Sequence, residues 1–352
     1  MYFTGVGTAV PPQRYLKSEC WEAFAASDWF RRLSPRAHMV AQAVLSRDNG
    51  IEARHLALDS LDDVFQIDPD TLAQRFLAHG PGLGAEAGAT ALRAAGLEAK
   101  RIDGIVVSTC TGYLCPGLSG YVAERLGLRP DVQAFDLVGQ GCAAALPNLR
   151  LSQALIASGQ CEQVLSVCVE VCSAAMYLDD DPGVLISACL FGDGAGAAVL
   201  SRKPSERMRR IEWRDAESLL DPEQRAALMF EQRGGMLRNI LTRQVPGLAA
   251  QYANEVLQRV LERSALEIGD IDAWIMHAGG RDVLQAVARR FGIADADLRY
   301  SAAMLRDYGN LSSAFVYFVL EAALRDEADG GNWWLSSFGA GFSCHGALLR
   351  VE

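Results

Sequence analysis

A cysteine stands in a glycine-rich turn near the middle of the chain. Residues 133–137 predict a strand, residues 143–158 predict a helix, and Cys142 lies between them, after Gly139 and Gly141. A helix N-terminus presents unpaired N–H groups and a partial positive charge, which lower the pKa of a thiol and can bind an oxyanion. The pattern predicts a nucleophilic cysteine, although a buried structural cysteine in a tight turn would look the same.

Two further polar residues lie at predicted element ends. His277 follows a predicted strand at 271–276, and Asn310 precedes a predicted helix at 311–324. Active sites of α/β folds gather at the carboxyl ends of strands, where a histidine can hold a thiolate, transfer a proton or donate to an oxyanion. A structural histidine would fit this position of His277 equally well, and simple helix capping would explain Asn310.

Taken together, the cysteine, histidine and asparagine fit two classes of enzyme. Cysteine peptidases use the same order, and the separation of Cys142 from His277 agrees with a papain-like enzyme. Against that interpretation, the Cys-Gly-Ser-Cys-Trp surround is missing and the cysteine lies in mid-chain. The second class is the decarboxylative condensing enzymes of the thiolase fold.

The elements that must position these residues alternate between strands and helices. Short β-branched runs are interleaved with helical stretches, which predicts an α/β fold. The segment 201–233 interrupts this pattern because it is charged and contains two prolines. We therefore predict two halves that meet near residue 205: residues 1–205 carry the nucleophile, and residues 206–352 carry the histidine and the asparagine.

Composition excludes several classes of function. The 352 residues are 50% hydrophobic with a formal net charge of −10, which disfavours nucleic-acid binding. No apolar run approaches the ~20 residues of a membrane helix, and residues 1–10 predict a strand rather than a signal peptide. Nine cysteines, an odd number with no Cys-x-x-Cys pair, predict reduced thiols and no metal site. The expected location is the cytoplasm.

At several places the sequence resembles the type III polyketide synthase (chalcone synthase-like) family. Residues 139–144, 277–280 and 308–313 resemble its three catalytic motifs, and residues 190–195 and 337–341 resemble two more. The resemblance extends over nearly the whole chain. Related ketoacyl-ACP synthases III usually carry His-Gln-Ala-Asn where this chain has His-Ala-Gly-Gly, so the type III family is favoured.

This resemblance implies a five-layered αβαβα thiolase-like fold in a homodimer, without metal or organic cofactor. Cys142 would accept a starter acyl group from a thioester of CoA or of an acyl carrier protein. His277 and Asn310 would bind the carbonyl of malonyl-CoA, stabilise the enolate left by decarboxylation, and so extend the chain repeatedly before it cyclises to a resorcinol, pyrone or other phenolic product. The resemblance also implies further substrate contacts, at Cys110, Phe191, Ser312, Gly339 and Gly341.

Some details resemble bacterial members, and others depart from the plant enzymes. The turn at 110–114 resembles tetrahydroxynaphthalene synthases, while residues 172–175 and 305–310 resemble dihydroxyphenylacetyl-CoA synthases; alkylresorcinol and alkylpyrone synthases also fit. Cys115 stands where the family places a residue that reaches across the dimer. Ser337 and Ala340 replace a glycine and a proline of the family's last loop.

Two substrate-binding regions align weakly with the family. Basic residues that could hold the CoA phosphates are hard to find near residues 41–48, where Arg47 is the nearest candidate, so a carrier protein stays open as the starter donor. Candidates for the cavity wall between residues 205 and 240 are Trp213, Phe230 and Asn239. The alternatives to iterative condensation are a single-condensation ketoacyl synthase III-like enzyme, a cysteine hydrolase and a non-catalytic thiolase-fold protein.

Overall fold

Strands from both ends of the chain form one large mixed sheet in the computed structural model, which describes residues 1–46 and 48–352. Arg47, the candidate contact for CoA phosphates, lies outside the described residues. From one edge to the other the order of the strands is β11 (Ile271–Met276), β12 (Gly331–Gly339), β13 (Ser343–Val351), β8 (Ile211–Leu220), β1 (Tyr2–Ala9), β7 (Gly194–Ser201), β6 (Gln163–Glu170), β4 (Gly104–Ser108) and β5 (Gln133–Leu137).

The sheet repeats one pairing pattern on its two sides. On one side β1 is antiparallel to β7, β7 is antiparallel to β6, and β6 is parallel to β4. On the other side β8, β13, β12 and β11 follow in the same order with the same directions. Two residue pairs, Tyr2 with Glu212 and Phe3 with Ile211, join β1 to β8. Residue 205 lies in the loop before β8. The repeated pairing pattern therefore supports the proposed division of the chain into two halves.

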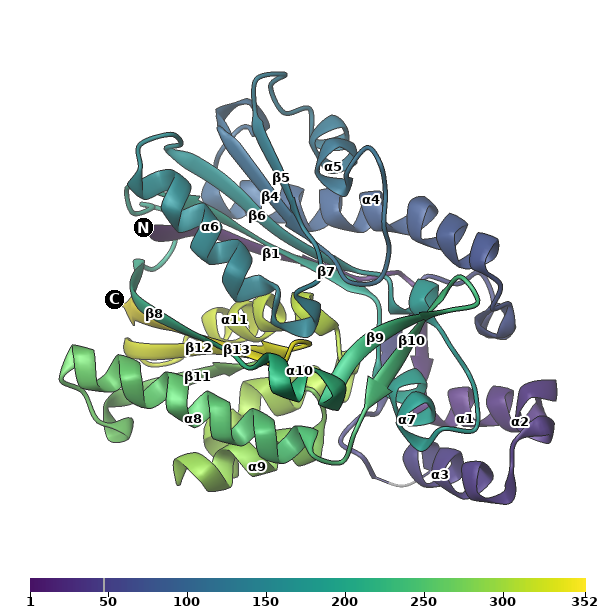
Figure 1. Cartoon of the computed structure of the whole chain (residues 1–352). Coiled ribbons are helices and arrows are strands. Elements are labelled where there is room, and N and C mark those ends of the chain that lie inside the picture. Colours follow the sequence, from purple (N-terminus) through teal and green to yellow (C-terminus); the bar gives the residue numbers. More distant parts are fainter. Residues whose placement is uncertain (47) are drawn as a thin grey trace.

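One limb of the sheet consists of β1, β7, β6, β4 and β5, and the other consists of β8, β13, β12 and β11. Helices cover both limbs and also fill the space between them (Figure 1). In the middle, α6 (Ala145–Ala157) and α11 (Phe315–Arg325) contact strands of both limbs. On the outside, α4 (Pro69–Ala95) packs on β1, β6 and β7 with α5 (Leu118–Leu126) beside it, and α8 (Val245–Ser264) packs on β8 and β13 with α9 (Arg281–Phe291) beside it. The layers therefore alternate as α, β, α, β, α, and α10 (Arg299–Tyr308) packs against α11.

Sequence pattern explains the central layer. The eleven residues of α11 are almost entirely apolar and buried, which is typical of a helix covered on all sides. Around the amphipathic α8, by contrast, the buried residues recur at helical spacing, from Ala249 through Tyr252 and Val256 to Val260. One hydrophobic core cluster includes residues of α6, α8 and α11 together with strands of both limbs.

Smaller elements gather beside this body. They are α1 (Lys17–Ala26), α2 (Asp28–Arg32), α3 (Pro35–Ser46), α7 (Pro182–Leu190), the pair β2 (Arg14–Leu16) and β3 (Ala53–His55), and the hairpin of β9 (Leu228–Arg233) and β10 (Met236–Leu241). The described part of the chain contains no helix long and apolar enough to cross a membrane.

Two predicted helices begin later than expected. Short 3-10 turns, η3 (Gly141–Ala143) and η8 (Ser312–Ala314), precede α6 and α11 and take up their predicted first residues. The backbone causes both shifts, because Gly141 and Ser312 have φ angles of +56° and +50°, which an α-helix cannot include. Cys142 and Ser312 therefore stand on turns that enter the two central helices.

Candidate active site

Hydrogen bonds connect the three sequence motifs to one another. The Ser312 hydroxyl lies 3.3 Å from Sγ of Cys142, and the backbone N–H of Ser312 donates to Oδ1 of Asn310 at 2.8 Å. The side-chain amide of Asn310 donates to the carbonyl of Gly279 at 3.3 Å, two residues beyond His277. Asn310 thus bonds to the first residue of the 3-10 turn η8, whose N-cap is Leu311, and does not cap an α-helix. These contacts bring Cys142 and Asn310 together with the loop that carries His277.

The His277 side chain is buried in an aromatic surround. Its ring packs edge-on against Phe315 of α11 and lies 5.1 Å, between ring centroids, from Phe338 of β12. Neither ring nitrogen has a hydrogen-bond partner among the described residues, and burial lowers the pKa of His277 to about 3. The imidazole is therefore neutral near pH 7, and it has one N–H donor and one acceptor nitrogen to offer to a ligand.

The thiol of Cys142 is also protonated at rest. Burial raises its pKa to about 12, and the nearby Glu170 carboxyl adds to this effect, while the hydrogen bond from Ser312 opposes it. The sequence predicted the opposite direction of shift. That prediction was wrong because Cys142 lies on a 3-10 turn and loses more from desolvation than it gains from unpaired N–H groups.

Glu170 is a buried acid that the sequence analysis missed. Its carboxyl accepts hydrogen bonds from Oγ1 of Thr111 at 2.9 Å, the N–H of Cys110 at 3.1 Å and Oγ of Ser312 at 3.3 Å, and also from Ser313. Burial raises the pKa of Glu170, whereas these donors lower it. A signal was present in the sequence, because Glu170 is the one charged residue in the predicted strand 163–171. A charged residue in a strand that is otherwise buried is a candidate for a functional role.

Cys110 joins the same cluster from the end of β4. Its sulfur lies 3.4 Å from Oε1 of Glu170 and 3.3 Å from the hydroxyl of Ser312. Burial and the Glu170 carboxyl hold the pKa of Cys110 well above its usual value. Ser312 therefore lies between two thiols and a carboxyl group, but it has only one proton to donate.

Two cavities meet at Cys110. The larger has a volume of about 490 Å³ and is lined by α4, the β9–β10 hairpin and the turn before Cys142, including Phe76, Met236 and Gly141. The smaller lies between α7 and the hairpin and is lined by residues such as Cys172, Tyr177, Val184, Phe191 and Asn239. Phe230 lines both cavities, so the hairpin forms a wall of each.

The other sequence candidates fall in different places. Phe191 and Ser312 line the smaller cavity, Phe230 lines both, and Asn239 lines the smaller one. Trp213 does not belong to either cavity wall; it lies in the core, stacked on Phe3. This candidate was wrong because strand β8, unknown from the sequence pattern, directs the indole inward.

The glycines of the last motif act on the backbone. A Cβ atom on Gly339 would lie 2.6 Å from the backbone nitrogen of Ala143 and 2.8 Å from the carbonyl oxygen of Gln140. Gly341 has a φ of +132° and faces Leu220 and Ser343 rather than either cavity. The hydroxyl of Ser337, which replaces a glycine of the family motif, donates to the Ala143 carbonyl at 3.0 Å. Strand β12 therefore packs closely against the turn that carries Cys142.

The thiols show no evidence of pairing or of metal binding. All nine cysteines are free, and Cys115 is exposed. Among residues 1–46 and 48–352, no group of three or more His, Cys, Asp or Glu side chains is arranged to hold a metal ion.

Comparisons with known proteins agree along the whole chain. Residues 85–214 match the family model for FAE1/type III polyketide synthase-like proteins, and residues 217–351 match the C-terminal domain of chalcone and stilbene synthases. A 1,3,6,8-tetrahydroxynaphthalene synthase of Streptomyces peucetius subsp. caesius is 34% identical over 98% of this chain and 92% of its own length. A 3,5-dihydroxyphenylacetyl-CoA synthase of Streptomyces toyocaensis is 30% identical over 98% of this chain and 89% of its own length.

The fold itself is also similar to a solved structure. The polyketide synthase of the brown alga Ectocarpus siliculosus superposes with a TM-score of 0.91, over 99% of this chain and 98% of the other, at 24% identity. This confirms the predicted thiolase-like α/β fold.

Proposed function

Because the chain belongs to the type III polyketide synthase family, we propose that Cys142, His277 and Asn310 are its catalytic residues. The enzyme is an acyltransferase that condenses malonyl-CoA repeatedly onto an acyl starter. The observation that supports these three residues most directly is the hydrogen-bonded series from Cys142 through Ser312 and Asn310 to the loop of His277. Beside it, His277 has two buried ring nitrogens without partners among the described residues.

In the loading step, the Cys142 sulfur attacks the carbonyl of the starter thioester. Because the resting thiol is protonated, it must lose its proton as the new C–S bond forms. The neutral His277 imidazole has a free acceptor nitrogen, which takes this proton and passes it to the carrier sulfur; the C–S bond to the carrier breaks, and the carrier leaves as its thiol. The Ser312 hydroxyl donates to the sulfur and stabilises the negative charge that develops there.

In the extension step, the side chains of His277 and Asn310 bind the thioester carbonyl of malonyl-CoA. When the carboxylate leaves as carbon dioxide, the electrons of the broken C–C bond form an enolate. Both residues are uncharged donors in a buried site, where hydrogen bonds to a developing oxyanion stabilise it most strongly. The enolate carbon then attacks the acyl carbon on Cys142, and the freed sulfur is ready for another cycle.

The relatives suggest the class of product. The Streptomyces relatives are named for a tetrahydroxynaphthalene and a dihydroxyphenylacetyl-CoA, both of which are phenolic. We place the extended chain in the two cavities that meet at Cys110, with Phe191 and Ser312 as contacts, and expect a resorcinol, pyrone or other phenolic product. Gly339 packs against the turn that carries Cys142, so we give it an indirect role in positioning that turn. A substrate contact at Gly341 stays a prediction. No CoA-phosphate contact is assigned, so the starter carrier is either CoA or an acyl carrier protein.

We also propose a cytoplasmic homodimer built from subunits of two similar halves, residues 1–205 and 206–352. Nine free thiols suit a reducing compartment. Two apolar side chains close to the larger cavity, Tyr113 and Val138, are 79% and 57% exposed, which suits a surface that a second subunit covers. Sedimentation of the purified protein would reveal a monomer if this part is wrong.

The catalytic assignment is tested by incubation with malonyl-CoA and a panel of aromatic and fatty acyl-CoA starters. Products are identified by mass spectrometry, and the intact protein is weighed to detect an acyl group. We expect products longer by several two-carbon units with the wild type and with Cys161→Ala, a cysteine outside the site, but none with Cys142→Ala. Acylation and product formation by Cys142→Ala would overturn the assignment.

A further inference from the structure

The β9–β10 hairpin has two different faces. Side chains alternate along a strand, so neighbouring residues point to opposite sides. Phe230 pairs across the hairpin with Asn239, and both line the smaller cavity. The adjacent pair, Glu231 and Arg238, projects from the opposite face of the hairpin. Consecutive residues of β10 therefore carry a cation on one face of the hairpin, Arg238, and a cavity-lining amide on the other, Asn239.

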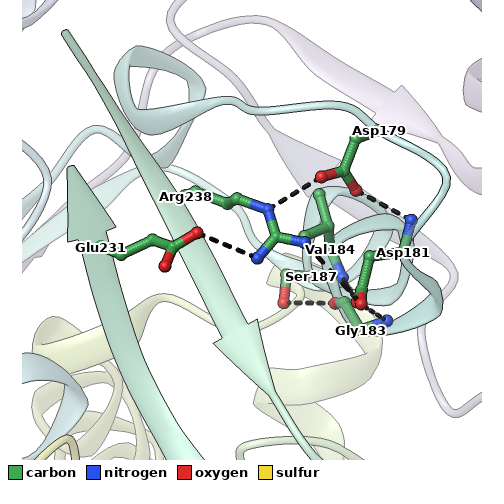
Figure 2. A network of polar contacts seen from close by, with 7 residues as sticks. All are labelled: Asp179, Asp181, Gly183, Val184, Ser187, Glu231 and Arg238. Atoms are coloured by element: carbon green, nitrogen blue, oxygen red, sulfur yellow. Dashed lines mark hydrogen bonds and ion pairs between the residues drawn. The ribbon is translucent and has the colours of Figure 1, made fainter. Parts of the chain in front are cut away.

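Arg238 connects the hairpin to the segment that precedes α7 (Figure 2). Its Nε donates to Asp179 at 2.8 Å, Nη1 lies 3.2 Å from Glu231, and Nη2 lies 3.7 Å from Asp181. The guanidinium is largely buried, with its side chain only 11% exposed. Partly buried charges held at several atoms fix geometry more strictly than apolar packing does.

The far end of this connection determines where α7 begins. Oδ1 of Asp181 accepts the N–H groups of Gly183 and Val184, and so caps the helix that Figure 2 shows beside the hairpin. Val184, like Asn239, lines the smaller cavity. Gly183 packs so closely on β10 that a Cβ atom there would lie 2.3 Å from the Leu241 carbonyl oxygen. Arg238 thus holds together two elements that line one cavity.

Asn239 is the residue that this arrangement directs inward. It is 8% exposed, it lines the smaller cavity, and its Oδ1 has no hydrogen-bond partner among the described residues. A buried amide oxygen without a partner is costly, and such groups are found where a ligand supplies the missing bond. The growing chain can supply it, because the enol form of a β-keto group carries an O–H donor.

We propose that Arg238 is a positioning residue for chain extension: it fixes the hairpin against α7 so that Asn239 binds the enol hydroxyl of the growing chain and thereby sets the product. This inference rests on the proposed function. It assigns Asn239 to substrate contact and gives Arg238 no contact with the substrate.

The test compares product ratios in Arg238→Gln, Arg238→Lys, Asn239→Leu and the double variant of Arg238→Gln with Asn239→Leu. The matched control is Arg263→Gln, because Arg263 also bridges two carboxylates, Asp215 and Glu217, but joins α8 to β8 far from the cavity. Each protein receives malonyl-CoA and one starter, and the products of different chain length are quantified. The rate of Cys142 acylation is measured separately by intact mass.

We expect Arg238→Gln and Asn239→Leu to change the ratio of product lengths in the same direction, by about fivefold or more. The double variant should add little to either, because both act through one contact. Arg238→Lys should restore part of the wild-type ratio. Cys142 acylation should stay within about twofold of wild type in Arg238→Gln and Arg238→Lys, and Arg263→Gln should leave the ratio unchanged.

Two outcomes would overturn the inference: an unchanged ratio in Arg238→Gln, or additive effects in the double variant. Should Arg238→Gln fail to fold, Asp179→Asn and Glu231→Gln each remove a single contact and must shift the ratio in the same direction. Failure of the proposed function looks different, since wild-type Cys142 would then acquire no acyl group at all.

Discussion

The hydroxyl oxygen of Ser312 lies 3.3 Å from the sulfur of Cys142. The same oxygen lies 3.3 Å from Glu170 Oε1 and 3.3 Å from the sulfur of Cys110. The single hydroxyl proton of Ser312 is therefore shared among three possible acceptors. It can stabilise a Cys142 thiolate only when the hydroxyl no longer donates to the Glu170 carboxyl group. Ser312 also has a φ of +50°, a conformation that is uncommon for non-glycine residues.

Replacing Ser312 by alanine should slow the acylation of Cys142. The variant loses the hydroxyl group that donates to the sulfur, a hydrogen bond of roughly 1 kcal/mol, so the rate should fall about fivefold to tenfold. Acylation by a starter thioester is followed by intact mass at pH 8. Ser152→Ala is the control, because it removes a buried hydroxyl from α6 that donates to the Asn148 carbonyl. Equal rates in wild type and Ser312→Ala would exclude this role.

The pKa values predict how Cys142 reacts with iodoacetamide in the absence of substrate. The thiol has a pKa of about 12 and His277 one of about 3, so both are neutral from pH 5 to pH 10. The thiolate fraction, and with it the alkylation rate, should rise about tenfold for each pH unit up to pH 10. A resting thiolate–imidazolium pair predicts instead a plateau that begins near neutral pH, and His277→Ala would then abolish it.

His277 should also make the protein sensitive to acid. Its pKa is lower in the folded state than the ordinary value of 6.5, so the unfolded chain binds a proton first as the pH falls. Stability is complete above pH 6.5 and is lost as the pH falls towards 3, by about 2 kcal/mol between pH 7 and pH 5. Urea unfolding at both pH values measures this loss. In His277→Asn the loss in the free energy of unfolding between pH 7 and pH 5 should be smaller than in the wild type by that amount, whatever the variant's stability at pH 7.

The three catalytic candidates were predictable because each stands beside a clear pattern. Cys142, His277 and Asn310 border strands or helices whose buried residues recur regularly, and glycines mark the turns. Arg238 and Asn239 carry no such signal, since the hairpin is short, half-exposed and set in a charged region. Its position depends on contacts with the segment before α7, where Asp179 lies 59 residues from Arg238 in sequence, and no local pattern contains such contacts.

Glu170 illustrates a different limit of the sequence. Its type and its place at the end of an apolar strand were visible, but its partners come from two separate segments, at 109–111 and 312–313. A buried charge can be structural or functional, and only the nearness of Cys142 distinguishes these cases. Likewise, the pKa of Cys142 was predicted in the wrong direction because desolvation depends on the packing of β12 and η8 around it.

Replacing Glu170 by glutamine should change stability and reactivity in opposite directions. The amide turns an N–H group towards hydrogen-bond donors, so we expect a loss of about 2 kcal/mol in the free energy of unfolding. Because the Glu170 charge raises the pKa of Cys142, its removal should speed alkylation at pH 8 by about twofold to threefold. Glu321→Gln, which alters a carboxyl bonded to Thr8 outside the site, should leave the alkylation rate unchanged. Slower alkylation in Glu170→Gln would contradict the assigned effect of the charge.

Finally, the close packing of Gly339 on the nucleophile turn predicts a loss of activity from a single methyl group. In Gly339→Ala the new Cβ would meet the backbone of Ala143 at 2.6 Å and that of Gln140 at 2.8 Å, and neither atom can rotate away as a side chain would. The turn η3 must therefore shift and carry the Cys142 sulfur with it. Since a displacement of ~1 Å can cost ~100-fold in rate, acylation should fall by about that factor.

The matched control for this change is Gly120→Ala, on helix α5. A Cβ atom at Gly120 would have no neighbour within 4 Å, and alanine is the better helix former by ~1 kcal/mol, so this variant should acylate normally and unfold at an equal or higher temperature. Acylation of Cys142 is timed by intact mass, and thermal unfolding is recorded for both variants. If Gly339→Ala acylates as fast as Gly120→Ala, then β12 does not position the nucleophile. If it is slow although still folded at the assay temperature, the lost rate reflects the displaced sulfur and not a lost fold.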